Sequence, residues 1–174
     1  MASRPQLGYA RAMSLKTIIT LLQRHDLFRE LAPTRLEVLA FTAERASFEA
    51  GDTLFEAGEE AFDAYLIVEG QCVMHVDQGM EPRSGEARAI RVDKGDLIGE
   101  MALLHEGRRQ STVRASSAVE ALSISRYLFQ RLMEEFPEMA GAVARALSER
   151  LAATSDEMND LARALGRQGH ENEP

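Results

Sequence analysis

Between Ala46 and Ser125 the sequence is a series of short strand-like runs, broken at close intervals by glycines and polar turns. The run "AYLIVEGQCVMHV" predicts two strands joined through Glu69–Gly70, and "AIRV", "STVRA" and "VEALSIS" predict further strands. Many short strands at close spacing are typical of a small antiparallel barrel. The segment therefore predicts a mainly β fold, an antiparallel β-roll or jelly roll.

Apolar residues at helical spacing flank this β segment on both sides. Before it, one helix is predicted from Leu15 and a second near Pro33, whose missing N–H costs nothing in a first turn. After it, helices are predicted from Arg126 and again from Pro137. Apolar positions three or four residues apart form a seam along the last helix: Val143, Leu147, Leu151, Thr154, Met158, Leu161 and Leu165. The seam fits either a parallel homodimer or a helix that lies on its own domain.

The length of 174 residues favours one domain with an appended element. We expect a flexible arm at residues 1–14, one domain at 15–151, a continuation of the C-terminal helix at 152–165 and a disordered tail at 166–174.

Composition excludes several classes of protein. The net charge of −8, from 28 acidic and 20 basic residues, argues against a broad nucleic-acid interface. A single cysteine, Cys72, cannot form a disulfide within the chain and fits a reducing compartment. The longest apolar run near the start is far shorter than a membrane span and lacks the pattern of a secretory signal. We therefore expect a soluble cytoplasmic protein.

The segment "GDLIGEMALLHEGRRQSTVRA" gathers groups that suit a sugar and a phosphate. Gly95 and Gly99 allow tight turns and a close backbone approach to a ligand. "EMALL" forms one good helical turn, whose first N–H groups would be free to bind an anion. Nine residues after Glu100 comes Arg109, a planar cation suited to phosphate, and the carboxylate could accept hydrogen bonds from sugar hydroxyls. Together these groups predict a nucleotide ligand.

The same segment resembles the phosphate-binding cassette of cyclic-nucleotide-binding domains, a family that includes the catabolite activator protein, the regulatory subunits of cAMP-dependent kinase and cyclic-nucleotide-gated channels. The resemblance runs from about Leu15 to Leu151 and is most specific in "VDKGDLIGEMALL" with the arginine nine places beyond the glutamate. "LFRELAPTRLEVLA" resembles the family's entry helix. The first strands also resemble those of the family, with these residues at turns and corners: Gly51, Gly58, Asp63, Tyr65 and Gly70.

The resemblance implies a role for each cassette residue. Gly99 and Ala102 would let the backbone close on the sugar-phosphate, and Glu100 would accept from the ribose 2′-hydroxyl. Arg109 would pair with the exocyclic phosphate oxygens, beside the backbone N–H groups of Ala102 and Gln110. The implied contacts of the cyclic nucleotide are Gly99, Glu100, Met101, Ala102, Arg109, Gln110 and Ser111. The expected ligand is cAMP, with cGMP as the alternative, and no other cofactor is expected.

Two positions depart from the family pattern. Arg108 replaces a proline that often precedes the key arginine, and Gln110 stands where Ala, Ser or Thr is usual. A Thr at that position commonly accompanies cGMP preference, so Gln110 leaves the choice of base open. It also supports an alternative, a degenerate member that binds no nucleotide and serves as a protein-interaction scaffold.

Nothing in the sequence predicts catalysis or a metal site. The histidines His25, His75, His105 and His170 lack metal-ligand spacing, and Cys72 has the alternating neighbours of a buried strand residue. No Walker loop, G-x-G-x-x-G or G-x-S-x-G motif occurs, which disfavours a small barrel enzyme. The residues after Ser125 are too few for a helix-turn-helix domain beside the seam helix. We expect a sensor without its own DNA-binding or catalytic domain, which forms a homodimer through the C-terminal helix and acts on an effector in trans. A fragment of a longer regulator is the alternative.

Overall fold

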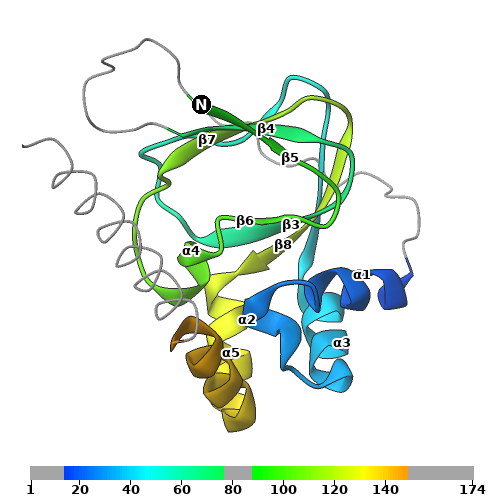
Figure 1. The fold of residues 1–174 in the computed structure, drawn as a ribbon, viewed down its shortest axis with the longest axis vertical. Helices are drawn as coiled ribbons and strands as arrows, with labels where there is room; N and C mark the ends of the chain where they lie inside the picture. Colours follow the sequence, from blue (N-terminus) through cyan, green and yellow to red (C-terminus); the bar gives the residue numbers. More distant parts are fainter. Residues whose placement is uncertain (1–13, 77–87, 149–174) are drawn as a thin grey trace, which may run out of the picture.

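A computed structural model, which describes residues 14–76 and 88–148, shows two four-stranded antiparallel sheets that form a β-roll (Figure 1). The first sheet has the strand order β1 (Glu44–Phe48), β8 (Val119–Ser125), β3 (Asp63–Glu69) and β6 (Leu97–Ile98). The second has the order β2 (Thr53–Phe55), β7 (Ser111–Ala115), β4 (Cys72–Val76) and β5 (Arg88–Val92). The predicted fold class, an antiparallel β-roll with flanking helices, is confirmed.

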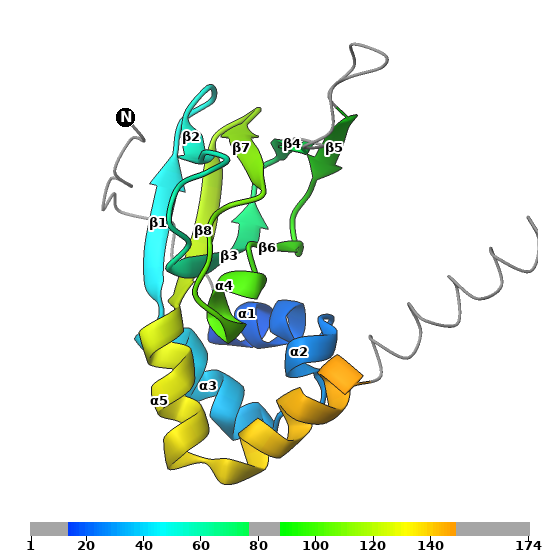
Figure 2. The same ribbon diagram turned by 90° about the vertical axis from the view of Figure 1, so that its left-hand side faces the viewer.

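Most of the helices gather at one end of the roll (Figure 2). They are α1 (Leu15–Leu22), α2 (Asp26–Arg29), α3 (Pro33–Thr42), α4 (Met101–Leu104) and α5 (Arg126–Glu135), and residues 137–148 are also helical. The helices predicted to start at Leu15, Pro33 and Arg126 are found. Phe136 is not helical and separates α5 from the last helix, as Pro137 indicates. The four-residue helix α2 is too short to produce an apolar period, so the sequence does not predict it.

Strand β3 is buried on both faces, and this position links the roll to the helices. Its alternate residues Ala64, Leu66 and Val68 belong to the core shared with the helices. Tyr65 and Ile67 point to the other face and belong to the core between the two sheets. Side chains alternate across a strand, so a strand covered on both faces reads as a continuous apolar run. "AYLIV" is such a run, and it fixes where the sheet meets the helical layer.

The predicted seam of the C-terminal helix begins inside this domain. Val143 lies in the helical core, and Leu147 packs against the same core. Ion pairs join this helix to the N-terminal helices, between Arg35 and Glu138 at 3.1 Å and between Arg145 and Glu30 at 2.9 Å. Val143 is therefore buried within the chain, and Leu147 uses part of its surface for the same internal packing. Positions 151–165 of the seam, the arm and the tail lie outside the described residues.

The turn between β3 and β4 supplies a test of the fold. Gly70 has φ +90°, and a Cβ there would lie 2.1 Å from the carbonyl oxygen of Ala118. Gly51 has φ +95°, and a Cβ there would have no atom within 4 Å, so Gly51 shares the backbone strain without the clash.

We expect Gly51→Ala to lower the free energy of unfolding by about 1–2 kcal/mol, the cost of a left-handed conformation for a residue with a Cβ. Gly70→Ala should cost clearly more, since two backbone segments must also separate. Urea unfolding of both variants measures the difference. Equal losses would show that the contact between the two turns is not tight.

The buried cysteine gives a second test. Cys72 is fully buried between the sheets, as the sequence predicts, and burial raises the pKa of its thiol to about 11. The folded protein therefore holds this proton more tightly than the unfolded chain does. The stability that this difference contributes is complete below about pH 9 and is lost as the pH rises through 11.

We expect iodoacetamide to label native Cys72 at pH 8 about 100-fold more slowly than the denatured chain, from the smaller thiolate fraction alone. The free energy of unfolding should fall more steeply between pH 9 and 11 in the wild type than in Cys72→Ala. Rapid labelling of the native protein would contradict the buried position of the thiol.

Candidate functional site

A cavity of about 270 Å³ is lined by residues of β2, β4 and α4 and by the segment that leads into β7. All the residues that the sequence predicts for the ligand line it: Gly99, Glu100, Met101, Ala102, Arg109, Gln110 and Ser111. The fold also brings to it residues that the sequence does not predict: Phe55, Ala61, Met74, Val76, His105, Gly107 and Arg108. Strands β2 and β4 thus contribute apolar side chains to the lining, and the cassette contributes the polar groups.

Backbone hydrogen bonds fix the two adjacent arginines. Arg109 N–H donates to the carbonyl of Glu59 at 2.8 Å, and the carbonyl of Arg109 accepts from Gly58 N–H at 2.8 Å. Ala61 N–H donates to the carbonyl of Gly107 at 2.9 Å. The cassette therefore runs beside residues 58–61 like a strand, and neighbouring side chains point to opposite sides. Arg109 turns inward and is buried, whereas Arg108 turns outward and is exposed.

The guanidinium of Arg109 is enclosed in the protein, and the residue is only 8% exposed. Its Nη1 donates to the backbone carbonyl of Asp63 at 2.7 Å, and its Nη2 forms an ion pair with Oδ1 of the same residue. Its carbon Cζ lies 4.1 Å from the centre of the Phe55 ring, a favourable position for a cation over an aromatic face. Its Nε is buried and has no hydrogen-bond partner among the described residues. One nitrogen of this cation, Nε, is therefore left for an additional acceptor.

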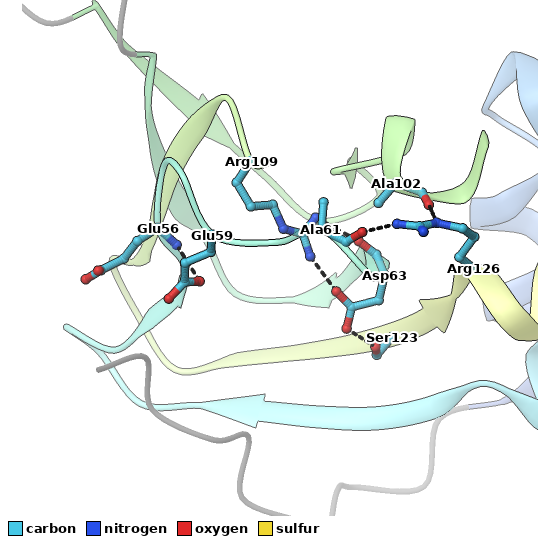
Figure 3. A network of polar contacts seen from close by, with 8 residues as sticks. All are labelled: Glu56, Glu59, Ala61, Asp63, Ala102, Arg109, Ser123 and Arg126. Carbon is cyan, nitrogen blue, oxygen red and sulfur yellow. Dashed lines mark hydrogen bonds and ion pairs between the residues drawn. The ribbon is translucent and has the colours of Figure 1, made fainter. Parts of the chain in front are cut away.

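Asp63 is the ion-pair partner of the buried Arg109 (Figure 3). Its second carboxylate oxygen accepts from the hydroxyl of Ser123 on β8 at 2.9 Å. Burial raises the pKa of the nearby Tyr65 far above its usual range, and the negative charge of Asp63 raises it further. The phenol therefore stays neutral, and Arg109 is the positive group that balances the carboxylate.

Gly99 gives Arg109 the space that it occupies. A Cβ at Gly99 would clash with Nη1 of Arg109, and the φ of +71° at Gly99 is one that residues with side chains rarely adopt. The resemblance assigns this glycine to backbone contact with a sugar-phosphate. The structure adds a second reason for a glycine, because any side chain here would displace the guanidinium.

One backbone N–H group of helix α4, that of Ala102, differs from the expectation. Ala102 N–H donates to the carbonyl of Gly99 at 3.0 Å, so in this structure it is already used within the turn. The expectation that it is free to meet a phosphate is wrong for this conformation, since a single helical turn begins by forming that bond. Glu100 is half-buried at the start of α4, and Met101 is exposed.

The two departures from the family pattern lie at the rim of the cavity. Arg108 is exposed, and its Nη1 donates to the carbonyl of Gly58 at 2.6 Å. It therefore fastens the cassette to the neighbouring turn. Gln110 is also exposed, one residue beyond the buried cation. Its amide carries both a donor and an acceptor at the mouth of the cavity.

Two of the histidines contact backbone carbonyls. His25 Nε2 lies 2.7 Å from the carbonyl of Gly95, and His105 at the rim contacts the carbonyl of Glu106 at 2.9 Å through Nδ1. In the ranges 14–76 and 88–148, no group of three His, Cys, Asp or Glu side chains could hold a metal ion. No helix within those ranges has both the length and the apolar composition needed to cross a membrane. His170 lies outside the described residues.

Two residues form contacts in or behind the cavity wall that the sequence does not predict: Asp63 pairs with Arg109, and Arg126 donates to the carbonyls of Ala102 and Ala61. Asp63 is expected there only at a corner of the fold, although an acidic residue directly before the apolar run "AYLIV" is a usable signal for a buried partner. Arg126 is expected only as the start of a helix. Each acts on residues far away in the sequence, and no local pattern marks such a pairing.

Comparison with known proteins agrees with this geometry. The cAMP-activated global transcriptional regulator CRP of Salmonella typhimurium is 30% identical over 99 residues, which are 56% of this chain and 46% of that protein. The N-terminal domain of a transcriptional regulator from Streptomyces coelicolor A3(2) superposes with a TM-score of 0.71 at 29% identity, covering 78% of this chain and 95% of that chain. The catabolite activator protein of Thermus thermophilus superposes with a TM-score of 0.64 at 27% identity, covering 79% of this chain and 63% of that chain.

The chain spans about half the length of the curated relatives it matches. The family model described as "Cyclic nucleotide-binding domain" matches residues 45–136. These residues run from β1 to the end of α5 and contain the whole lining of the cavity. They are more than half of the sequence, and the chain belongs to the cyclic nucleotide-binding domain family.

Proposed function

We propose that the cavity binds one cyclic mononucleotide, with cAMP as the expected ligand, and that the protein is a sensor whose output is a change in its helices. The observation that carries this proposal is the buried Arg109, which lines the cavity and has a donor without a partner among the described residues. A buried donor without an acceptor costs free energy, and an anion that supplies the acceptor recovers that cost.

The phosphate of the ligand would share Arg109 with Asp63. The Nε atom is screened from the cavity, so an anion reaches it only if the guanidinium moves outward from its present position. Binding would then loosen or redirect the bonds from Nη1 and Nη2 to Asp63. In this proposal, ligand occupancy and the position of Asp63 are linked.

The size and lining of the cavity support a mononucleotide. Its volume of about 270 Å³ is close to the lower end of the ~300–1,000 Å³ typical of small-molecule sites, which favours one nucleotide over two linked ones. The apolar side chains of Met74 and Val76 suit a flat base, and Glu100, which also lines the cavity, suits a ribose hydroxyl. The choice of cAMP is supported by the named relatives, and Gln110 keeps cGMP as the alternative.

The degenerate alternative also has an observation in its favour. Asp63 already neutralises Arg109, so the site is stable without an anion. In that case the domain would serve as an interaction scaffold. A homodimer through the C-terminal helix, an effector in trans, a cytoplasmic location and the absence of catalysis stay predictions of the sequence.

A thermal-shift and titration series with cAMP, cGMP and cyclic di-AMP tests the proposal. A ligand that binds the folded state at 100 times its Kd adds ~2.7 kcal/mol. For a chain of this size we expect a rise in Tm of roughly 5–10 °C with cAMP. Cyclic di-AMP should give no rise, because the cavity is too small. No shift with either mononucleotide would favour the scaffold.

Variants of the two adjacent arginines test how the ligand is held. Arg109→Ala removes the counter-charge of the phosphate and should weaken cAMP binding by roughly 30-fold to several thousand-fold, or about 2–5 kcal/mol. Arg109→Lys should recover part of this, because an ammonium cannot reproduce the planar fork. Glu100→Gln should cost about 1–2 kcal/mol, from a weaker hydrogen bond to the ribose.

Arg108→Ala is the matched control, because it removes an exposed arginine from the same rim and should leave the affinity almost unchanged. Calorimetric titration measures all four variants, after circular dichroism has shown that each is folded. If Arg108→Ala were as damaging as Arg109→Ala, the phosphate would have to lie at the rim and not at the buried cation.

A further inference from the structure

A second arginine, Arg126, lies directly behind the cavity wall and is the first residue of α5. Its side chain is only 13% exposed. Its Nε donates to the carbonyl of Ala102 at 2.6 Å, and its Nη2 donates to the carbonyl of Ala61. Both acceptor residues line the cavity. One side chain therefore joins two separate parts of the cavity wall to the start of a helix.

The backbone of the same residue adds a third connection. Arg126 N–H donates to the carbonyl of Phe62 at 2.8 Å, next to the Ala61 bond. Its Nη1 lies 3.7 Å from the carboxylate of Glu106, but that side chain is 94% exposed and the pair contributes little. The hydrogen bonds to backbone carbonyls are thus the main contacts of Arg126.

Residues 61–63 are consequently held from both sides by arginines (Figure 3). Arg109 binds the carbonyl and carboxylate of Asp63, and Arg126 binds the carbonyl of Ala61. The two binding points are two residues apart, so both arginines hold the same short stretch of backbone.

The position of Arg126 is unfavourable for the helix itself. A positive side chain in the first turn is repelled by the positive end of the helix dipole. Ser125, whose hydroxyl accepts from Leu128 N–H at 3.2 Å, already caps this end. An arginine here is explained by its bonds to the cavity wall and not by helix stability.

We propose that Arg126 is the positioning residue that makes α4, residues 61–63 and α5 move together, so that occupancy of the cavity is transmitted to the C-terminal helices. The proposal rests on the proposed function, because the ligand acts first on Arg109 and Asp63. Beyond Arg126, the Phe129 ring packs edge-on against Phe28 at 6.0 Å, so a shift of α5 reaches the N-terminal helices as well.

A guanidinium is suited to this role because of its geometry. It presents donors in a fixed plane and can bind two carbonyls that lie in different directions at once. A lysine in its place could reach one of them with a single ammonium. Coupling between two sites requires a structural element whose position depends on both of them. Because coupling is reciprocal, a change in the helix should also alter the affinity for the ligand.

The test compares Arg126→Met, which keeps the apolar stem, with Arg126→Lys and with the control Arg131→Met. Arg131 lies on the same helix, is 56% exposed and pairs only with Glu135 among charged groups that the structure describes. Hydrogen exchange is measured by mass spectrometry on the full chain, without ligand and with saturating cAMP.

In the wild type and in Arg131→Met, cAMP should slow exchange in the cassette at 99–112 and also in residues 126–148. In Arg126→Met the cassette should still respond, while the response of 126–148 is lost. Arg126→Lys should restore part of it. A full response of the helices in Arg126→Met would overturn the proposal.

The unliganded samples separate this proposal from the proposed function. Loss of bonds from a charged donor should raise exchange about tenfold or more at residues 61–63 and 101–104, as well as at the start of α5. If the exchange rate rises only in α5, Arg126 supports only its own helix, and the proposed coupling is overturned. If the wild-type protein does not respond to cAMP at all, the proposed function fails. The exchange rates of unliganded wild type and Arg126→Met still decide whether Arg126 couples these segments. If Arg126→Met does not fold, Arg126→Lys gives the same comparison at smaller amplitude.

Discussion

The ion pair between Arg109 and Asp63 is the interaction on which the site depends. A guanidinium can be enclosed in a protein only when its charge is balanced, and Asp63 balances it with a carboxylate while its backbone carbonyl accepts a further hydrogen bond. Removing one partner of a buried pair typically costs ~3–5 kcal/mol. The glycine at position 99 follows from the same constraint, because any larger residue would occupy the place of the guanidinium.

The pair also explains why two distant segments lie side by side. Residues 58–61 and 107–109 are joined by backbone hydrogen bonds in a strand-like arrangement. This brings Arg109 to the beginning of β3, where Asp63 stands. Since β3 is buried on both faces, its start cannot shift without disturbing either the inter-sheet core or the helical core. The position of the cation is therefore set by the most constrained strand of the fold.

Local patterns are enough to predict the main elements and the cassette side of the cavity. Glycines and alternating runs mark the strands, apolar spacing marks α1, α3 and α5, and the seven predicted cassette residues do line one cavity. The pairing of Arg109 with Asp63 joins residues 46 positions apart, and the bond of Arg126 to Ala61 joins residues 65 apart. Such pairs depend on strand order, which periodicity does not encode. The two-residue strand β6 and the helix α2 are too short to carry a period at all.

The seam of the last helix shows a different limit of sequence patterns. Spacings of three and four residues arise whenever one face of a helix is buried, whether the neighbour is a second copy or another part of the chain. Val143 is buried among helices of its own domain, and Arg145 binds Glu30 across that contact. The first part of the seam thus orients the helix by internal packing. Of the two seam positions that the structure describes, Val143 is buried and Leu147 packs partly against the same core.

Arg109 and Arg126 differ in how their donors are used, and this difference indicates their roles. Each nitrogen of the Arg126 guanidinium faces an acceptor, two of them backbone carbonyls in the cavity wall. It can hold that wall, but it has little capacity left for a ligand. Arg109 has the same chemistry but keeps Nε without a partner among the described residues, and its partner Asp63 can be shared with a competing anion. A cation bonded to two carbonyls of the wall can act as a brace, whereas one with a buried nitrogen that lacks a partner among the described residues can act as a receptor, and residues 61–63 connect the two.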